Sequence, residues 1–361
     1  MLKEIGSNFW LNPDTIIGSE KHIDMSSVGI FGKNTVLLST GRGAQLYVLK
    51  DIEAYNPQTK KVALIPPFTC KTVIEPFIRM GYEIHTYPIN DKLITTPGML
   101  KCAIDEYNPS VVLIHRYFGF DTLKNCGELI VQERKNGIVF IEDRTQNIFS
   151  VFESLPVDYV VGSLRKWVGV PDGGFAVSEK EFLIEKPTQY DSELMNSKLC
   201  AMSAKYEYMV NDKGEKQSFL ERYKEAENIL NAEDKFYKIS PVSEAVFYAL
   251  DVDELRRKRR NNYTVIYNGV KDLEGITPLT PILSDGETPL YFAMYVVDRV
   301  KLQNKLREEN IYAPVVWPLS DVSPEVCGAA LDIYKHVLCI PIDQRYGEDD
   351  MNRVCKHIKQ E

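Results

Sequence analysis

The sequence has 361 residues, of which 44% are hydrophobic and 26% charged, ordinary values for a soluble globular protein of one or two domains. Its formal net charge of −8 argues against a nucleic-acid-binding protein, and the lack of any run of about 18 apolar residues argues against a membrane span. Its 7 cysteines form no CxxC pair and no spacing with histidines, so we expect reduced thiols, a cytoplasmic location and no metal site.

Short apolar runs with the character of β-strands recur through the first half of the chain. They lie at 34–40, 61–68, 82–89, 110–118, 137–144, 158–163 and 173–179. Between several of them, residues 43–55, 70–81 and 122–137 have the three-to-four apolar spacing of helices. Strands that alternate with helices predict an α/β fold with a mostly parallel central sheet covered by helices on both faces.

The second half of the chain predicts a smaller α+β domain. Residues 181–235 are polar and predict little beyond a helix at 218–237. A long helix is expected from about Ser243 to Val270, and its basic run RRKRRNNY (256–263) is typical of a solvated face. A strand at 290–298, a helix at 299–311, extended pieces at 313–319 and 336–342 and a last helix at 347–360 follow. We therefore expect a large domain over 1–240 and a small one over 241–361.

In a parallel sheet, ligands bind beyond the carboxyl ends of the strands, so the residues that follow each run are candidates for a site. The first strand leads into a glycine turn, STGRGA (39–44), which opens a helix. Such a helix start offers backbone N–H groups and the positive end of the helix dipole to a phosphate. Many helices simply begin after a glycine, so this turn alone is a weak signal.

An acidic residue, Asp143, follows the apolar run GIVFIE. A carboxylate at the end of a buried strand costs free energy unless it meets a partner. It could cap the next helix, which is the ordinary role, or it could face a cationic ring nitrogen.

A lysine turn follows the run DYVVG, with Ser163 and Lys166 ahead of the glycine pair at 173–174. Burial turns a lysine into a usable amine nucleophile, although a lone loop lysine is solvent-exposed by default. A phosphate turn, a carboxylate and a lysine at one edge of a sheet are together the set that pyridoxal 5′-phosphate needs. The glycine pair would let the chain turn back close to this cofactor.

The order of these motifs resembles the fold-type I pyridoxal-phosphate enzymes, and most of all the DegT/StrS (DegT/DnrJ/StrS) group of nucleotide-sugar aminotransferases. The resemblance covers nearly the whole chain and is more specific for the fold than for the substrate. Its motifs are STGRGAQL, IPPFTCKTVIEPFIRMGYEIHTYPIN, IHRYFGF, IEDRTQN, GSLRKWVGVPDGG, LREENIYAPVVWPL and VLCIPIDQRYGEDDMNRV.

The resemblance implies roles for three residues that would act on the ring or on the substrate. Lys166 would form the Schiff base with the cofactor and later move a proton. Asp143 would pair with the pyridine nitrogen, and Gln146 would bond the ring hydroxyl.

The resemblance also implies how the phosphate and the ring face would be held. Ser163, with the backbone around Arg42 and Gly43, would hold the phosphate. Phe68 is a candidate to pack on the ring face, and the stacking position of the group aligns nearer Cys70.

As a function, the resemblance implies an aminotransferase that carries an amino group from glutamate or glutamine to a keto sugar, linked to a nucleotide, by a ping-pong mechanism. It also implies a homodimer in which residues of one subunit reach the other's cofactor. Small molecules would then be the partners, and no nucleic acid or membrane.

The chain departs from the pattern of the group at several places. Only two residues separate Ser163 from Lys166, as in the desulfurase and epimerase branch of the fold. Phe236 stands where the group has the Asn that reaches the partner's phosphate, with Lys238 in place of its Arg, and Arg144 replaces a small residue. Two alternatives stay open. One is a lyase, an epimerase or a desulfurase with Cys200 as its candidate cysteine, and the other is a non-catalytic regulatory relative.

Overall fold

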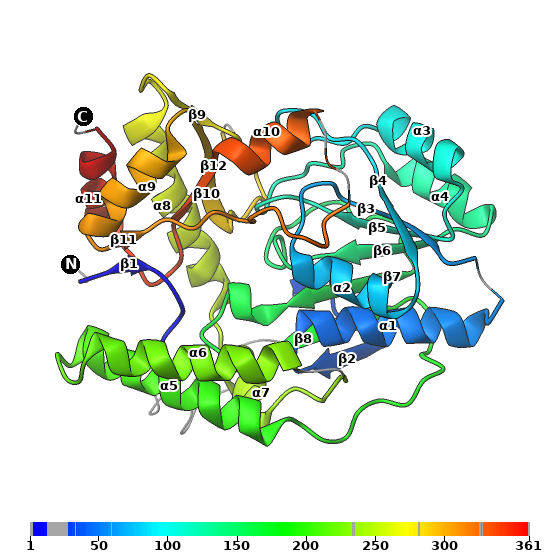
Figure 1. Cartoon of the computed structure of the whole chain (residues 1–361), viewed down its shortest axis with the longest axis horizontal. Coiled ribbons are helices and arrows are strands. Elements are labelled where there is room, and N and C mark those ends of the chain that lie inside the picture. Colours follow the sequence, from blue (N-terminus) through cyan, green and yellow to red (C-terminus); the bar gives the residue numbers. More distant parts are fainter. Residues whose placement is uncertain are drawn as a thin grey trace. The chain divides into compact units, whose positions relative to one another are not determined.

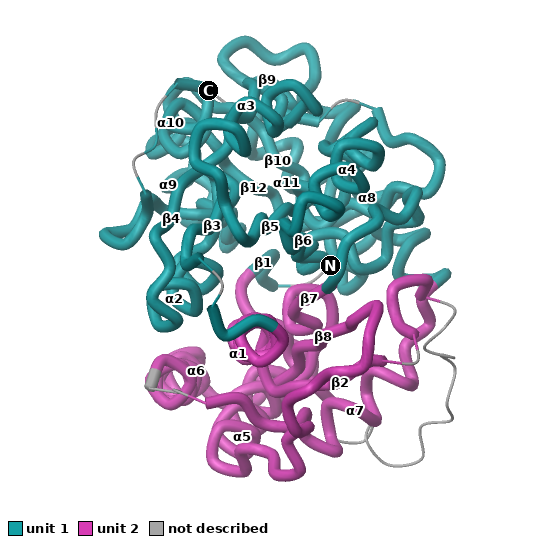
Figure 2. Tube along the Cα trace, turned by 90° about the vertical axis from the view of Figure 1, so that its right-hand side faces the viewer, with its two compact units in different colours: residues 1–6, 56–159, 253–361 teal, residues 7–55, 160–252 magenta. Residues whose placement is uncertain are grey.

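The computed structural model describes residues 3–12, 28–32, 34–58, 60–232, 235–280, 282–324, 326 and 328–359. The chain folds into two compact units that alternate along the sequence (Figure 2). Unit 1 comprises residues 1–6, 56–159 and 253–361, and unit 2 comprises residues 7–55 and 160–252.

Each of the seven predicted strands is present, and together they form a seven-stranded sheet of order β2-β8-β7-β6-β5-β3-β4 (Figure 1). The strands are β2 (Thr35–Leu38), β3 (Val62–Ile65), β4 (Glu83–Thr86), β5 (Val111–His115), β6 (Val139–Asp143), β7 (Tyr159–Ser163) and β8 (Gly174–Ser178). The pairs β3–β4, β3–β5 and β5–β6 are parallel, and β2–β8 is antiparallel. The predicted α/β class with a mostly parallel sheet is confirmed.

In unit 1, the central strands are buried along their whole length. Every residue of β3 and β5 is buried, as expected for parallel strands covered on both faces. The helices α2 (Lys71–Arg79), α3 (Pro97–Tyr107) and α4 (Gly127–Lys135) connect these strands. Of these, the sequence did not predict α3, which Thr96 caps by accepting a hydrogen bond from the Met99 amide.

The remainder of unit 1 is built around a three-stranded antiparallel sheet, β12-β10-β9. Its elements are α8 (Val252–Val270), β9 (Ile276–Pro278), β10 (Tyr291–Val296), α9 (Arg299–Glu308), β11 (Ile311–Tyr312), α10 (Gly328–His336), β12 (Val337–Pro341) and α11 (Glu348–Lys359). The short strand β1 (Ile5–Gly6) pairs in parallel with β11.

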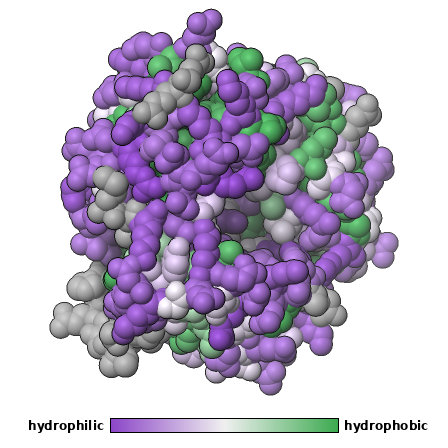
Figure 3. Space-filling model, turned by 60° about the vertical axis from the view of Figure 1, so that its left-hand side comes forward, coloured by the Kyte–Doolittle hydropathy of each residue, from purple (hydrophilic) through white to green (hydrophobic). Residues whose placement is uncertain are grey.

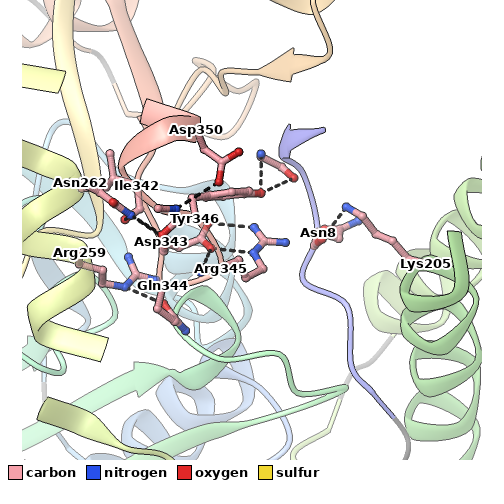
Figure 4. Close-up of polar contacts among 12 residues, drawn as sticks. Asn8, Lys205, Arg259, Asn262, Ile342, Asp343, Gln344, Arg345, Tyr346 and Asp350 are labelled. Atoms are coloured by element: carbon pink, nitrogen blue, oxygen red, sulfur yellow. Dashed lines mark hydrogen bonds and ion pairs between the residues drawn. The ribbon is translucent and has the colours of Figure 1, made fainter. Parts of the chain in front are cut away.

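Polar side chains of α8 hold the loop that follows β12 (Figure 4). Arg259 donates from Nε to Gln344 Oε1 at 3.0 Å and from Nη1 to the Leu290 carbonyl at 2.9 Å. Asn262 donates to the Ile342 carbonyl, and Arg345 forms an ion pair with Asp343 at 2.7 Å. The basic run was expected on a solvated face, but Arg259 is fully buried, so that prediction is wrong for this residue.

Unit 2 contains α1 (Gly41–Tyr55), the 3₁₀ turn η3 (Leu164–Lys166), α5 (Ser192–Val210), α6 (Lys216–Ala232) and α7 (Pro241–Tyr248). The helices α5 and α6 run side by side as a hairpin (Figure 1). The segment after residue 7 is fixed to this hairpin, because Lys205 donates to the Asn8 carbonyl at 2.7 Å (Figure 4). Tyr223 donates to the Phe9 carbonyl at 2.6 Å.

Two predictions about the helices fail. The long helix expected over 243–270 is two helices, α7 and α8, because the amides of Ala249 and Leu250 bond back to the Phe247 carbonyl and close α7. Asp251, of a residue type that favours N-caps, then precedes α8. The polar stretch 181–235 contains α5 as well as the expected helix, which is α6. The predicted domain boundary near residue 240 stays a prediction.

The face of the molecule drawn in Figure 3 is mostly hydrophilic, with apolar side chains in small scattered groups. Among the helices that the structure describes, none is long and apolar enough to span a bilayer.

Candidate functional site

The predicted phosphate turn begins α1 in unit 2. The Thr40 hydroxyl accepts a hydrogen bond from the Gly43 amide at 2.9 Å, and the Thr40 carbonyl accepts from the Ala44 amide at 2.9 Å. Thr40 therefore caps the helix, and the Gly43 N–H that the sequence assigned to phosphate already has a partner. The side chain of Arg42 reaches Asn231 of α6 at 3.4 Å.

Glycines allow three backbone segments to meet at this turn. A Cβ at Gly174 would lie 2.3 Å from both the carbonyl carbon and the oxygen of Thr40, and one at Gly41 would lie 3.0 Å from Ser163 Cβ. Only glycine tolerates such approaches. The structure thus brings Ser163, the helix start and the glycine pair together within unit 2, as the sequence predicted.

The lysine turn is short and well anchored. Lys166 ends η3, directly after β7, and its side chain is exposed, whereas Leu164 and Trp167 on either side are buried. The Leu164 amide donates to the Gly173 carbonyl at 3.1 Å, so the turn and the glycine pair close one loop. The Lys166 side chain therefore projects from a turn that the backbone holds in place.

A buried carboxylate in this loop escaped the sequence analysis. Asp172 is 1% exposed and accepts hydrogen bonds from the Ser240 amide at 2.9 Å, the Ser240 hydroxyl at 2.6 Å and the Ser243 hydroxyl. Burial raises the pKa of Asp172, while the two serines oppose that shift. The residue ties the lysine loop to the start of α7.

In unit 1, Asp143 ends β6 and is buried. Its Oδ1 accepts a hydrogen bond from the Thr145 amide at 2.8 Å, and residues 145–149 form turns, so Asp143 caps no helix. Burial raises the pKa of this carboxyl, and the hydrogen bonds from Thr145 oppose the shift. A cation placed against it would offset the cost of ionising it there.

Gln146 follows Asp143 by three residues, and one donor group of its side-chain amide has no hydrogen-bond partner among the described residues. Its Oε1 accepts from the Phe118 amide at 2.8 Å, whereas its Nε2 is buried without a hydrogen-bond partner among the described residues. A buried amide group that lacks a partner costs about 1–3 kcal/mol. This orphan N–H₂ fits a ligand oxygen such as a ring hydroxyl.

His115 is a second residue that sequence reasoning missed, although it ends the apolar run at 110–118. It pairs with Asp143 in the parallel register of β5 and β6. Burial lowers the pKa of His115 to about 3, so the imidazole is neutral at ordinary pH. Its Nε2 also has no hydrogen-bond partner among the described residues.

Phe68 is enclosed by the protein's own aromatic side chains. It is fully buried, with ring centroids 4.7 Å from Tyr334, 5.3 Å from Trp317 and 5.8 Å from Tyr117. This packing leaves little of the ring for a ligand, whereas Cys70, at the N-cap of α2, is half-buried. Phe68 thus fits the core of unit 1 better than the stacking role.

Arg144 belongs to a buried ion network. Arg116 Nη1 lies 3.2 Å from Glu142 Oε1, and Arg144 Nε lies 3.8 Å from the same oxygen. Arg144 Nη2 also donates to the Ser150 carbonyl at 3.3 Å. The departure from a small residue at this position is therefore explained by packing inside unit 1.

Phe236 also has a partner within its own chain. Phe236 packs against α1. Its Cβ lies 3.4 Å from the position of a Cβ built on Gly43, and the centroid of its ring lies 5.1 Å from that of the Tyr47 ring. The Lys238 amide donates to the Gln189 carbonyl at 2.8 Å, and the Lys238 side chain is exposed.

The desulfurase alternative finds little support in the geometry. Cys200 is exposed but lies inside α5, so it is not on a loop that could swing as a desulfurase cysteine must. Over the described part of the chain, no group of three His, Cys, Asp or Glu side chains could hold a metal ion.

No family model matches the chain, and no curated protein matches its sequence. Solved structures do match. The aminotransferase PseC of Helicobacter pylori, involved in the biosynthesis of pseudoaminic acid, is 12% identical, with a TM-score of 0.71 over 99% of this chain and 98% of that one. The sugar aminotransferase CalS13 of Micromonospora echinospora is 18% identical, with a TM-score of 0.68 over 98% and 99%.

A third structure is the putative sugar aminotransferase Spr1654 of Streptococcus pneumoniae in its PMP form, which is 14% identical with a TM-score of 0.69 over 99% of this chain and 97% of that one. These similarities extend over both chains from end to end. They show that the chain has the fold of these aminotransferases, which confirms the fold that the sequence predicted.

Proposed function

We propose that the protein is a pyridoxal-phosphate-dependent aminotransferase that moves an amino group from glutamate or glutamine to a keto sugar linked to a nucleotide. The observation that carries the proposal is the pair of buried side chains at the carboxyl end of β6. Asp143 is a carboxylate that a cation would stabilise, and Gln146 offers a buried N–H₂ without a partner. The shared fold of the sugar aminotransferases supports it.

Asp143 and Gln146 would act on the ring of the cofactor. Asp143 would keep the pyridine nitrogen protonated, which in turn would relieve the cost of its own ionisation. Gln146 would donate its orphan N–H₂ to the ring hydroxyl. Pyridoxal phosphate, when bound, supplies an electron sink that stabilises negative charge on a substrate carbon.

Ser163, Lys166 and the start of α1 would bind the phosphate and the aldehyde end. Ser163 and the N-terminus of α1 around Arg42 and Gly43 would hold the phosphate, because a helix start attracts anions. The amine of Lys166 would bind the cofactor covalently and, once released by the amino donor, would carry the proton between substrate atoms. Its exposure and its rigid turn suit both tasks.

The proposal is tested by loading the purified protein with pyridoxal phosphate and adding a panel of amino donors. We expect glutamate or glutamine to bleach the absorbance band of the lysine-bound cofactor and to yield the matching 2-oxo acid. A keto sugar should then restore the band. A protein that binds the cofactor but responds to no donor would favour the regulatory relative, and release of sulfide from cysteine or racemisation would favour the other enzyme classes.

A further inference from the structure

The buried carboxylate of Asp172 ties the loop that follows the lysine turn to the start of α7. Its Oδ2 accepts a hydrogen bond from the Ser240 amide at 2.9 Å, and its Oδ1 accepts from the Ser240 hydroxyl at 2.6 Å and from the Ser243 hydroxyl. The Asp172 amide in turn donates to Ser243 Oγ at 3.2 Å. We refer to Asp172, Ser240 and Ser243 as the serine clamp.

Three hydrogen-bond donors and the N-terminus of α7 surround this carboxylate. Asp172 is 1% exposed, and a buried carboxylate costs free energy unless donors compensate it. Ser240 is the N-cap of α7, so the positive end of the helix dipole also lies at the carboxylate. An asparagine has nearly the same shape, but it keeps one acceptor oxygen and places an N–H₂ group where a donor now points. Asp172→Asn therefore breaks the clamp without emptying its volume.

Gly173, the next residue, contacts both parts of the proposed phosphate site. Its amide donates to the Ser39 carbonyl at 2.5 Å, and Ser39 leads directly into the turn that starts α1. Its carbonyl accepts from the Leu164 amide at 3.1 Å and from the Ser163 hydroxyl at 3.5 Å. With a φ of +138°, Gly173 has a backbone conformation that other residues rarely adopt. The place of this one peptide therefore sets the spacing between Ser163 and the start of α1.

The segment that precedes α7 runs along the other edge of β2. The Ser39 amide donates to the Tyr237 carbonyl at 2.9 Å, and the Ile239 amide donates to the Leu37 carbonyl at 3.3 Å. Ser39 is thus bonded to Gly173 through its carbonyl and to Tyr237 through its amide. The serine clamp joins these two flanking segments to each other, which closes a ring of hydrogen bonds within unit 2 at the strand end that leads into α1.

We propose that Asp172 is a positioning residue for phosphate, because the serine clamp holds the Gly173 peptide where Ser163 and the start of α1 can bind the same phosphate group. A phosphate is bound by several N–H and O–H donors at once, so their relative placement decides how tightly it is held. The inference rests on the proposed function for the identity of the ligand, pyridoxal phosphate. The ring of hydrogen bonds itself needs no cofactor.

The test compares two ligands that differ only in the phosphate group. Pyridoxal phosphate and pyridoxal are titrated into the wild type and into Asp172→Asn, and binding is followed by absorbance. Asp172→Asn should lower the affinity for pyridoxal phosphate by about tenfold or more, while the affinity for pyridoxal stays within about twofold. Ser243→Ala removes one of the three donors, so it should lower the ratio of the two affinities in the same direction by a smaller factor. This milder variant decides the question if circular dichroism shows that Asp172→Asn does not fold.

The control is a carboxylate with the same kind of structural contacts in unit 1. Asp158 accepts from the Phe140 amide at 2.9 Å and from Arg134 Nη2 at 2.7 Å. Asp158→Asn should lower the stability but leave the ratio of the two affinities as in the wild type. A merely structural role for Asp172 would weaken the binding of both ligands equally. That result, or an unchanged ratio in Asp172→Asn, would overturn the proposal.

Failure of the proposed function is separable, because it would appear as a wild type that binds no pyridoxal phosphate. Inorganic phosphate then decides the inference, through amide hydrogen exchange of residues 39–44 measured by mass spectrometry. Phosphate that slows this exchange in the wild type and in Asp158→Asn, but not in Asp172→Asn, would leave the positioning role standing. Exchange that phosphate does not slow in the wild type, or slows equally in Asp172→Asn, would overturn it.

Discussion

Asp143 is a buried carboxylate that weakens the folded state at neutral pH. Burial raises the pKa of its carboxyl above the value in the unfolded chain, so the folded state holds the proton more tightly. As pH rises past about 4, ionisation is easier in the unfolded chain and the stability of the folded chain falls. The ionised Asp143 carboxylate thus destabilises the folded chain at neutral pH unless a cation lies next to it.

We therefore predict that Asp143→Asn, without cofactor, is more stable than the wild type at pH 7 by on the order of 1 kcal/mol, and that the gain shrinks near pH 4. Urea unfolding at the two pH values measures this, with Asp285→Asn on the surface as the control. The same variant should bind pyridoxal phosphate yet transfer amino groups on the order of a hundredfold more slowly. Lower stability of the variant at pH 7 would show that the carboxylate already has a stabilising partner.

Lys198 allows a second prediction at this scale. Burial lowers its pKa in the folded chain from 10.5 to about 8. Between these values the unfolded chain binds more protons, so this residue makes stability rise with pH. Lys198→Met should therefore be more stable than the wild type at pH 7, by roughly 1–3 kcal/mol, with the gap closing toward pH 10.5. Thermal unfolding across this range measures it against Lys224→Met, and a gap that does not change with pH would contradict it.

At the scale of elements, the strands of the central sheet were predictable, whereas the helices α3 and α5 were not. The strands of the central sheet are short apolar runs that end at turn residues, and each was found within a few positions of its predicted place. The helix α5 escaped because its buried face mixes apolar residues with Lys198 and Lys205. Two buried lysines interrupt the apolar period on which helix prediction depends.

In the candidate site, too, local features could be predicted from the sequence and contacts between distant residues could not. Asp143 and Gln146 could be placed from the sequence, because a strand end and its next residues are local. The clamp of Asp172 by Ser240 and Ser243 could not, since partners 68 and 71 residues apart leave no mark in the local pattern. The ring packing around Phe68 was missed for the same reason, because Trp317 and Tyr334 are distant in sequence.

The glycine pair gives a prediction for one element junction. A Cβ at Gly174 would overlap the Thr40 backbone at 2.3 Å, which no side-chain movement can relieve. Gly174→Ala should lower the stability by several kcal/mol, or weaken phosphate binding at the helix start at least tenfold, about 1.4 kcal/mol. Gly98→Ala, where nothing lies within 4 Å, is the matched control. Wild-type stability together with wild-type cofactor affinity in Gly174→Ala would show that the turn is not as tight as described.

For the whole molecule, we predict a two-fold symmetric dimer in solution. The phosphate turn has few side-chain donors, Ser163 and Arg42, and the Gly43 amide is already bonded to Thr40. A doubly charged phosphate needs more partners than these, and a neighbouring subunit could supply them through residues 200–240. Sedimentation at micromolar protein should give the mass of two chains, about twice 41.3 kDa. A monomer with full cofactor occupancy would contradict the dimer.

If a dimer forms, the phosphate site is completed either by the partner subunit or within one subunit. The Phe at position 236, where the aminotransferase group has an Asn, bears on this choice. Phe236 packs on α1 of its own chain, so the exposed Lys238 is the better candidate to reach a partner's phosphate. Lys238→Ala should then weaken pyridoxal-phosphate binding about tenfold without changing the sedimentation behaviour. Unchanged affinity would instead indicate a phosphate site completed within one subunit.

The central claim is that Lys166 holds pyridoxal phosphate, and covalent trapping tests it most directly. The protein is incubated with pyridoxal phosphate, reduced with borohydride and digested, and the modified peptide is sequenced by mass spectrometry. The account predicts one stoichiometric adduct, on Lys166, which is lost in Lys166→Ala. An adduct on another lysine such as Lys198, an adduct that persists in Lys166→Ala, or no adduct at all would contradict it.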